Sequence, residues 1–283
     1  MSIAVTGAAG QLGHLVIKNL KLKTSLANLL ALVRNPEQTE VLGVTAKAID
    51  YSKPATLDSA LSGVETLLLI SSSEIGQRAA QHANVIAAAK KAGVKRIVYT
   101  SVLHADTSVL SLAEEHRATE ADLKSSGLSY TILRNGWYTE NYTGSVGAAL
   151  ANGAFFGSAG DGRISSATRE DLADAAVAVL TTDGHVNATY ELAGDTAWTL
   201  AELAAEISKQ TGKDIPYRNL SESDYAAALE GAGLPKGLAA AFASYDVSAS
   251  QGALYGSERT LSELIGRPTT SLATSVERAL KAL

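Results

Sequence analysis

Three glycines near the start of the chain, Gly7, Gly10 and Gly13, follow a G-x-x-G-x-x-G spacing between an apolar run and an amphipathic segment. Glycine permits a tight turn and lets the backbone approach a ligand closely. The start of the helix that follows would offer free N–H groups and a positive dipole end, which together suit a pyrophosphate. A glycine triplet alone can equally be a purely structural strand–helix turn. Here it follows the first predicted strand and opens a βαβ pattern, which favours dinucleotide binding.

The end of the second predicted strand indicates which dinucleotide would bind. Chains that bind NAD usually place Asp or Glu there for the ribose hydroxyls, whereas this chain reads "LLALVRNP", with Arg34 at that point and no acid beside it. A guanidinium can pair with a 2′-phosphate, so NADPH is favoured over NADH. The alternative is a solvated surface arginine. Asp50, after the third predicted strand, either reaches the adenine amine or caps the next turn.

These residues depend on elements that alternate along the chain. Strands are predicted at 3–6, 29–33, 46–49, 66–71, 96–101 and 130–133, and a further strand at 189–193. Helices are predicted at 76–92, 112–125 and 170–181, and the segment after residue 198 is mostly helical. Strands alternating with helices predict an α/β fold, a Rossmann doubly wound parallel sheet.

The rhythm of the elements also suggests two domains. We expect residues 1–134 to form an NADPH-binding Rossmann domain, with residues 154–182 returning to it. Residues 135–153 and 183–283 are expected to form a smaller, mostly helical substrate or cap domain. Residues 135–168, which follow the sixth predicted strand, are rich in glycine, serine and aromatic residues, and such loops commonly carry functional sites.

Several longer stretches resemble the NmrA-like branch of the atypical short-chain dehydrogenases over essentially the whole chain. They are "TGAAGQLG", "LVRNP", "LLLISSSEIGQRAAQHANVI", "YTSVLHAD", "YTILRNGWYTENY" and "ELAGD". Within that branch the chain is most similar to the bacterial type-2 NADPH:quinone oxidoreductases, and less so to the triphenylmethane dye reductases. The resemblance implies an NADPH cofactor in the cleft of a two-domain fold and two-electron reduction of quinones.

The resemblance also implies which residues contact the cofactor. They are Gly7, Ala8, Ala9, Gly10, Gln11, Leu12, Arg34, Glu74, Ile75, Gly76, Tyr138, Thr139, Glu140, Asn141, Tyr142, Thr143 and Arg169. The third glycine and residues that follow the third and fourth predicted strands complete the expected cofactor site: Gly13, Asp50, Ser72 and Ser73.

The Tyr-x-x-x-Lys pair of most short-chain dehydrogenases is missing, because none of the ten tyrosines has a lysine four positions later. The helix that should carry the pair has His116 and Glu120 on one face instead. They are either a replacement acid pair or a hydrogen bond on the helix surface. Without a positioned proton donor, ordinary alcohol–ketone chemistry is disfavoured. Quinone reduction is more tolerant, because the hydroquinone anion is a stabilised phenolate that water can protonate.

Candidate substrate-side residues follow the carboxyl ends of the strands, where the crevice of an open α/β sheet lies. Trp137 or Tyr138 could form a wall against which a flat aromatic substrate stacks. Asn135, Tyr138 and His104 could hydrogen-bond a quinone oxygen. We therefore predict Asn135, Trp137, Tyr138 and His104 as catalytic residues. The structural alternatives are interdomain packing for Trp137 and loop capping for His104.

The composition narrows the class of protein. Hydrophobic residues make up 46% and charged residues 19% of the 283 positions, with a net charge of −5. This balance does not favour nucleic acid as a partner. The lack of cysteine excludes disulfides and thiol chemistry, and no metal-ligand spacing is present among the five histidines. No signal peptide or membrane-inserted segment is expected, which fits a cytoplasmic protein.

Three functions remain open at this stage. The first is an NADPH-dependent quinone reductase with a small-molecule quinone as its partner. The second is a redox sensor that binds NADP(H) and regulates a partner without turnover, and the third is a reductase of dyes or other conjugated electrophiles. Monomer and homodimer are both compatible with the sequence.

Overall fold

The computed structural model describes residues 2–37 and 43–283. The strands of its main sheet are β1 (Ile3–Thr6), β2 (Leu29–Val33), β3 (Thr45–Ala48), β4 (Thr66–Leu69), β5 (Arg96–Val102), β6 (Ser129–Asn135) and β8 (Ala188–Leu192). Among the described residues they form a seven-stranded parallel sheet in the order β3-β2-β1-β4-β5-β6-β8. The order reverses between β1 and β4, which is where a doubly wound sheet opens a ligand crevice. The predicted Rossmann architecture is confirmed.

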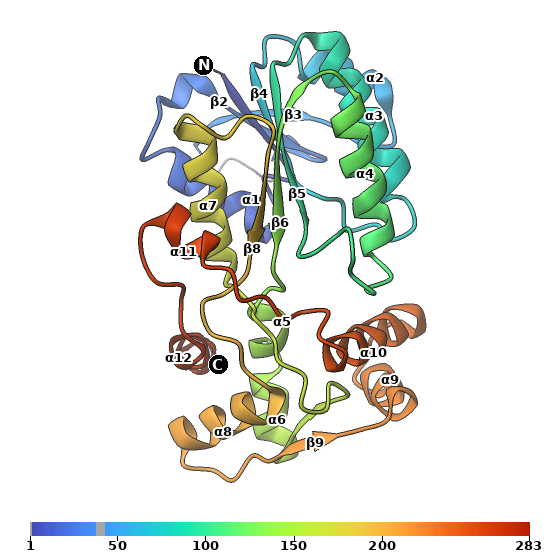
Figure 1. The fold of residues 1–283 in the computed structure, drawn as a ribbon, viewed down its shortest axis with the longest axis vertical. Helices are drawn as coiled ribbons and strands as arrows, with labels where there is room; N and C mark the ends of the chain where they lie inside the picture. Colours follow the sequence, from blue (N-terminus) through green and yellow to red (C-terminus); the bar gives the residue numbers. More distant parts are fainter. Residues whose placement is uncertain (1, 38–42) are drawn as a thin grey trace.

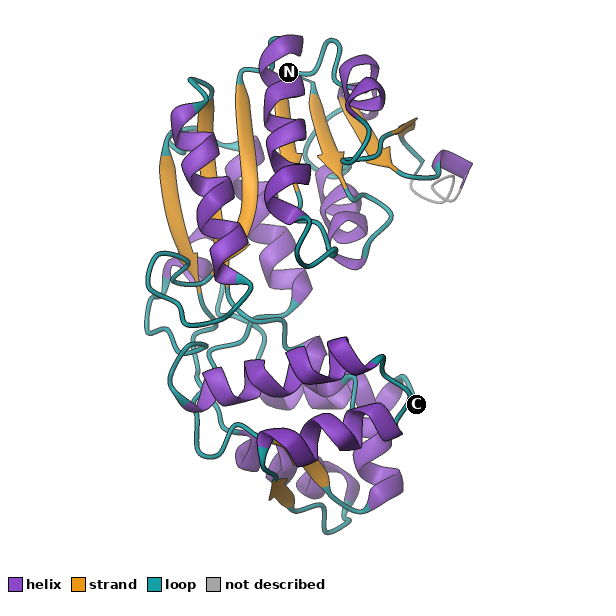
Figure 2. Cartoon of the chain, turned by 90° about the vertical axis from the view of Figure 1, so that its right-hand side faces the viewer, coloured by secondary structure: helices purple, strands orange, loops and turns teal. Residues whose placement is uncertain are grey.

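Helices cover both faces of this sheet (Figures 1 and 2). One layer contains α1 (Gln11–Leu20), α7 (Arg169–Thr181) and α11 (Thr260–Ile265), and the other contains α2 (Pro54–Ala60), α3 (Arg78–Ala92) and α4 (Ala113–Ser125). Strand β1 shows how the sequence produces both layers. Its Ile3 and Val5 are buried against the first layer, and Ala4 is buried against the second. The inner strands β1, β2 and β4 are largely apolar because both of their faces meet helices.

A second, mostly helical unit lies beyond the carboxyl edge of the sheet (Figure 1). Its elements are α5 (Glu140–Thr143), α6 (Val146–Asn152), β7 (Phe155–Gly157), α8 (Leu200–Thr211), β9 (Tyr217–Asn219), α9 (Glu222–Gly231), α10 (Lys236–Ser250) and α12 (Leu272–Lys281). Aromatic and aliphatic side chains from these elements form a core separate from the two layers around the sheet. None of the helices within residues 2–37 and 43–283 is long and apolar enough to cross a membrane.

Two segments lie elsewhere than the predicted domain boundaries placed them. Strand β8 lies within 183–283 but pairs in parallel with β6 in the main sheet, with Thr131 opposite Ala188. Strand β7 lies within 154–182 but pairs with β9 in the small unit. The sequence pattern gives the existence of a strand but not its partner, because the pairing is set by contacts far apart along the chain. The small sheet β7–β9 was not predicted.

Candidate active site

The turn between β1 and α1 has a backbone that only glycine adopts easily. Gly7 has a φ of +58°, in the left-handed region, and the N–H of Gly10 donates to the carbonyl of Gly7 at 2.9 Å. Gly10 is also the N-cap residue of α1, and no side chain caps the first turn of this helix. The free N–H groups at the helix start therefore suit the pyrophosphate of a dinucleotide.

The third glycine of the motif has a different task. A Cβ atom on Gly13 would lie 2.3 Å from the carbonyl oxygen of Gly7 and 2.8 Å from the Cα of Ala8. Gly13 therefore allows α1 to pack closely on the turn, and a contact of Gly13 with the cofactor remains a prediction. Ala8 and Leu12 have buried side chains in the core, so only their backbone atoms are available to a ligand.

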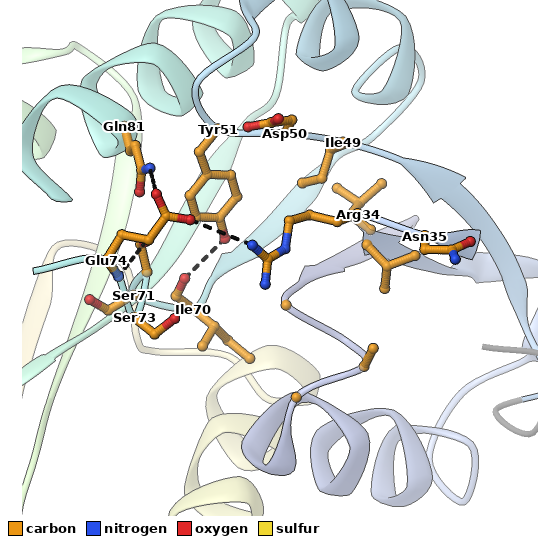
Figure 3. A pocket seen from close by; sticks show the side chains of 16 residues that line it. Arg34, Asn35, Ile49, Asp50, Tyr51, Ile70, Ser71, Ser73, Glu74 and Gln81 are labelled. Carbon is orange, nitrogen blue, oxygen red and sulfur yellow. Dashed lines mark hydrogen bonds and ion pairs between the residues drawn. The ribbon is translucent and has the colours of Figure 1, made fainter. Parts of the chain in front are cut away.

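A cavity of about 440 Å³ opens beside the turn (Figure 3). Apolar side chains from three strand ends form part of the wall, and the rest comes from the glycine turn, from polar groups after the second, third and fourth strands, and from α3. The lining residues are Gly7, Ala9, Gly10, Leu32, Val33, Arg34, Asn35, Ile49, Asp50, Tyr51, Ile70, Ser71, Ser72, Ser73, Glu74 and Gln81. The cavity brings the predicted glycine turn, Arg34, Asp50 and the serine loop together, and its size and lining fit the adenosine half of NADPH.

Arg34 extends across the mouth of this cavity toward the loop after β4 (Figure 3). Its guanidinium Nη1 lies 3.5 Å from Oε1 of Glu74, and 79% of the Arg34 side chain is exposed. The other carboxylate oxygen of Glu74 accepts a hydrogen bond from the side-chain amide of Gln81 at 2.8 Å. An exposed guanidinium at the end of β2 has the chemistry and the freedom to meet a 2′-phosphate.

Asp50 makes the contacts of a turn cap. Its carboxylate accepts the N–H of Ser52 at 2.9 Å and lies 3.1 Å from the ammonium group of Lys53. The hydrogen bond from Ser52 and the contact with Lys53 lower the pKa of Asp50 below its usual value. The capping alternative is therefore realised, although Asp50 also lines the cavity. Its neighbour Tyr51, which was not predicted, lines the cavity and donates its hydroxyl to the carbonyl of Ile70 at 3.0 Å.

The loop 72–76 is held by the first turns of α3, a feature that was not predicted. The Nε of Arg78 donates to the carbonyl of Ser72 at 2.6 Å, and the N–H of Ser72 donates to Nε2 of His82 at 3.0 Å. The other ring nitrogen of His82 bonds Oγ1 of Thr119 at 2.9 Å. Burial, helped by the charge of Arg78, lowers the pKa of His82 to about 4, so the ring is a neutral acceptor at pH 7. The sequence feature that could have indicated these contacts is the i, i+3, i+4 spacing of Arg78, Gln81 and His82 shortly after the serines.

The end of this loop points away from the cavity. Ile75 is 51% exposed, and Gly76 has a φ of +84°. Neither residue lines the cavity, in contrast to Ser72, Ser73 and Glu74. Contacts of Ile75 and Gly76 with a cofactor remain predictions.

The loop after β6 gathers three of the expected site residues. Asn135 is 5% exposed, and its Oδ1 has no hydrogen-bond partner among the described residues. The guanidinium carbon of Arg169 lies 4.2 Å from the centre of the Tyr138 ring. Burial raises the pKa of Tyr138 despite the charge of Arg169 and a hydrogen bond with Asn135, so its hydroxyl is protonated at neutral pH. The Tyr138 hydroxyl can therefore donate to the carbonyl oxygen of a substrate, whereas Oδ1 of Asn135 can only accept a hydrogen bond.

A second cavity, of about 570 Å³, lies between the start of α1, the loop after β6 and α12. Arg169 is fixed at its edge by Oδ1 of Asn141 at 2.9 Å and by the carboxylate of Glu140 at 3.3 Å. Five expected cofactor residues of the loop and of α7 line it, together with Gln11: Thr139, Glu140, Asn141, Thr143 and Arg169. The residues of α12 and of the two positions after it that close the cavity were not predicted: Ser275, Arg278, Ala279, Ala282 and Leu283.

Three residues of the predicted site have mainly packing contacts. Tyr142 is buried in the small-unit core, 5.3 Å from Trp198 between ring centres. Trp137 packs edge-on against Tyr245 of α10, with 5.4 Å between the ring centres, in the core of the small unit. His104 has a φ of +52°, and its Nε2 lies 3.4 Å from a carboxylate oxygen of Glu258. Direct substrate contacts for Trp137 and His104 remain predictions.

His116 and Glu120 are neither an acid pair nor a surface hydrogen bond, so both alternatives were wrong. Both side chains are buried and face the sheet. Nδ1 of His116 bonds the Tyr99 hydroxyl at 2.7 Å, and Glu120 accepts from Nε and Nη2 of Arg134 at 2.9 and 2.8 Å and from Ser101 at 2.7 Å. Burial lowers the pKa of His116 to about 3. Burial raises the pKa of Glu120, but the bonds from Arg134 and Ser101 outweigh it and the pKa falls below its usual value.

Comparisons with known proteins agree with this geometry. Residues 7–183 match a family described as NAD(P)H-binding. The chain is 59% identical to quinone oxidoreductase 2 of Escherichia coli (strain K12) over 97% of both chains. The crystal structure of that NADPH-dependent enzyme with NADPH superposes with a TM-score of 0.96, covering 98% of this chain and 99% of the other.

More distant relatives share the architecture. The Citrobacter sp. triphenylmethane reductase complexed with NADP(H) is 39% identical, with a TM-score of 0.95 over 98% of this chain and 100% of its own. The negative transcriptional regulator NmrA, in complex with NAD, has a TM-score of 0.78 over 99% of this chain and 96% of its own. Its identity of 16% supports a likeness of fold alone.

Proposed function

The chain belongs to the NAD(P)H-binding family, within the NmrA-like group that it resembles, and from this premise we propose that it is an NADPH-dependent quinone reductase. The substrate class follows from the 59% identity with quinone oxidoreductase 2 over 97% of both chains. The reaction is the two-electron reduction of a quinone to a hydroquinone. NADPH, when bound, supplies the hydride.

One observation carries the mechanism beyond the resemblance. The helix face that holds Tyr-x-x-x-Lys in most short-chain dehydrogenases is occupied here by a closed network in which His116 and Glu120 bond Tyr99 and Arg134. A general acid must reach the atom it protonates, and these two groups are directed into the sheet. The reaction therefore has to be one that tolerates the lack of a dedicated acid on α4, and quinone reduction is such a reaction.

The residues of the β6 loop would orient the quinone. The protonated hydroxyl of Tyr138 can donate to a quinone oxygen, which favours the negative charge that develops there on hydride arrival. The side chain of Asn135 lies beside it, and Arg169 fixes the ring of Tyr138 from above. The hydroquinone anion then takes its proton from water, so that one hydride and one proton complete the reduction.

The glycine turn and the 440 Å³ cavity would hold the adenosine and pyrophosphate portion of NADPH. Gln11 and the loop residues Thr139–Thr143, with Arg169, would hold the rest, in line with their place around the second cavity. Residues 2–37 and 43–134, together with α7 and β8, would form most of this cofactor-binding unit, while the small unit would bound the substrate side. We place the enzyme in the cytoplasm, as a monomer or homodimer.

A dye reductase is the second candidate, because the 39% identical triphenylmethane reductase shares the fold over the whole chain. It would use the same hydride donor on a cationic conjugated acceptor. A redox sensor without turnover has weaker support, because the likeness to NmrA is one of fold.

Oxidation of NADPH, followed by absorbance, separates these candidates when soluble quinones and a triphenylmethane dye are offered in parallel. We expect turnover with quinones, faster with NADPH than with NADH. Tight NADPH binding without oxidation by any acceptor would favour the sensor. Turnover with the dye alone would favour the dye reductase.

A further inference from the structure

The 440 Å³ cavity has an unusual charge balance for a site that receives a phosphorylated ribose. Of its lining residues, all of which lie in the described part of the chain, Arg34 is the single cation, while Asp50 and Glu74 are carboxylates. The charge of Asp50 is balanced by Lys53 at 3.1 Å. The charge of Glu74 is balanced by Arg34, the same guanidinium that a 2′-phosphate needs.

Hydrogen bonds fix both the carboxylate and the backbone of Glu74. Its Oε2 accepts the amide of Gln81 at 2.8 Å, and its own N–H donates to Oγ of Ser72 at 3.1 Å. Gln81 is only 4% exposed, and its amide nitrogen is also 3.1 Å from Oγ of Ser52. Arg34, with 79% of its side chain exposed against 51% for Glu74, is the more exposed partner, and Glu74 is its one ion-pair partner among the described residues (Figure 3).

We propose that Glu74 is a specificity-determining residue that competes with the 2′-phosphate for Arg34. When a dinucleotide without this phosphate binds, Arg34 keeps its contact with Glu74. When a 2′-phosphorylated one binds, Arg34 has to turn to the phosphate, and the carboxylate of Glu74 is left without its cation. Glu74 therefore reduces the preference for NADPH over NADH that Arg34 creates. The inference rests on the proposed cofactor and adds a second residue to its selection.

The test measures binding of two fragments, so it does not depend on turnover. The dissociation constants of 2′,5′-ADP and 5′-ADP are measured by titration calorimetry for the wild type and Glu74→Gln. A glutamine keeps an oxygen that can accept from Gln81, so the loop contact is retained. We expect 2′,5′-ADP to bind about threefold to fivefold more tightly, the scale of one exposed ion pair, and 5′-ADP to change by less than about twofold.

A matched control removes the same charge elsewhere. Glu277 on α12 is also paired with a lysine at the surface, and 54% of its side chain is exposed, against 51% for Glu74. It lines neither cavity. Glu277→Gln should leave both dissociation constants unchanged. An equal gain in this variant would reduce the effect to net charge and overturn the proposal.

The Arg34→Ala background tests whether Glu74 acts through Arg34. In that background Glu74→Gln should no longer tighten 2′,5′-ADP binding, because there is no guanidinium to release. A gain that persists there would mean direct repulsion of the phosphate and would overturn the competition. A wild type that does not distinguish the two fragments would remove the cofactor assignment itself. A wild type that distinguishes them with no effect of Glu74→Gln would remove only this inference.

Discussion

Two polar regions of the main domain, the glycine turn of β1–α1 and the α4–β6 network, differ in how their polar groups are satisfied. The first turn of α1 has no side-chain cap and opens into a 440 Å³ cavity. In the network, the carboxylate of Glu120 accepts hydrogen bonds from Nε and Nη2 of Arg134 and from the hydroxyl of Ser101. Nδ1 of His116 is hydrogen-bonded to the hydroxyl of Tyr99. Both regions contain the residue types that do chemistry.

The difference separates binding from architecture. Groups left without protein partners beside a cavity are available to a ligand, whereas buried groups that satisfy one another hold the fold and specify it. On this basis we propose that the turn binds the cofactor, whereas the network joins α4 to β5 and β6.

The largest effect is expected at the turn. Gly10→Val places a branched side chain in the wall of the cavity, with its Cβ 3.1 Å from the carbonyl of Gly7. NADPH binding, measured by calorimetry, should weaken by more than about 100-fold while the protein stays folded, because the pyrophosphate loses its close approach. Gly231→Val, at a site with no atom within 4 Å of the new Cβ, is the control. Normal NADPH affinity in Gly10→Val would place the phosphates elsewhere.

Substitutions in the α4–β6 network should change the free energy of unfolding rather than NADPH binding. Glu120→Ala leaves the buried Arg134 with only Glu191 and Asp106 as partners. Breaking a buried pair costs about 3 kcal/mol or more in the free energy of unfolding, which denaturant titration measures. Glu114→Ala, on the exposed side of the same helix, should change it by less than about 0.5 kcal/mol. A stable Glu120→Ala protein that binds NADPH normally but has lost turnover would make Glu120 catalytic.

A substitution of Arg34 tests whether the 440 Å³ cavity binds the 2′-phosphate of NADPH. Arg34→Ala should weaken NADPH binding by about 1.5–3 kcal/mol, the scale of a hydrogen bond to a charged group, and leave NADH binding nearly unchanged. Arg218→Ala, an exposed arginine on β9, is the control and should affect neither. Equal losses for both dinucleotides would remove Arg34 from the 2′-phosphate.

Low pH should lower the free energy of unfolding through the buried histidines. The pKa values of His82 and His116 are lowered to about 4 and about 3, while an unfolded histidine titrates near 6.5. Below pH 6.5 the unfolded chain therefore binds protons that the folded chain does not, and stability falls as pH falls. Asp246, whose pKa burial raises to about 6, acts in the opposite direction. The net fall in unfolding free energy from pH 7 to pH 5 should be about 2 kcal/mol.

Replacement of one histidine tests this origin. His82→Asn should remove most of this net loss, because each histidine contributes about 2 kcal/mol between pH 7 and pH 5 and Asp246 offsets much of what remains. Asp246→Asn should steepen the loss. A stability that is flat between pH 7 and pH 5 in the wild type would mean that these histidines are not held neutral.

How much the sequence could predict differs between the two regions for a physical reason. The bounds predicted for β1 and β2 agree with the structure, and the glycine turn follows from local backbone demands. The partners of His116 and Glu120 lie on β5 and β6, so helix periodicity placed both on one face without saying that this face was buried. The hold of α3 on the serine loop and the wall provided by α12 also depend on contacts between distant segments.

The smallest effect tests the central claim, that hydride transfer to a quinone proceeds without a dedicated proton donor from the chain. The measurement is kcat for quinone reduction at saturating NADPH in Tyr138→Phe, His104→Ala and His116→Asn, the last of which keeps a polar group for Tyr99. Each variant should retain kcat within about tenfold of the wild type, well below the ~10²–10⁴-fold loss that follows removal of a general acid. A variant that binds NADPH normally and loses kcat by that larger factor would contradict the account and identify the proton donor.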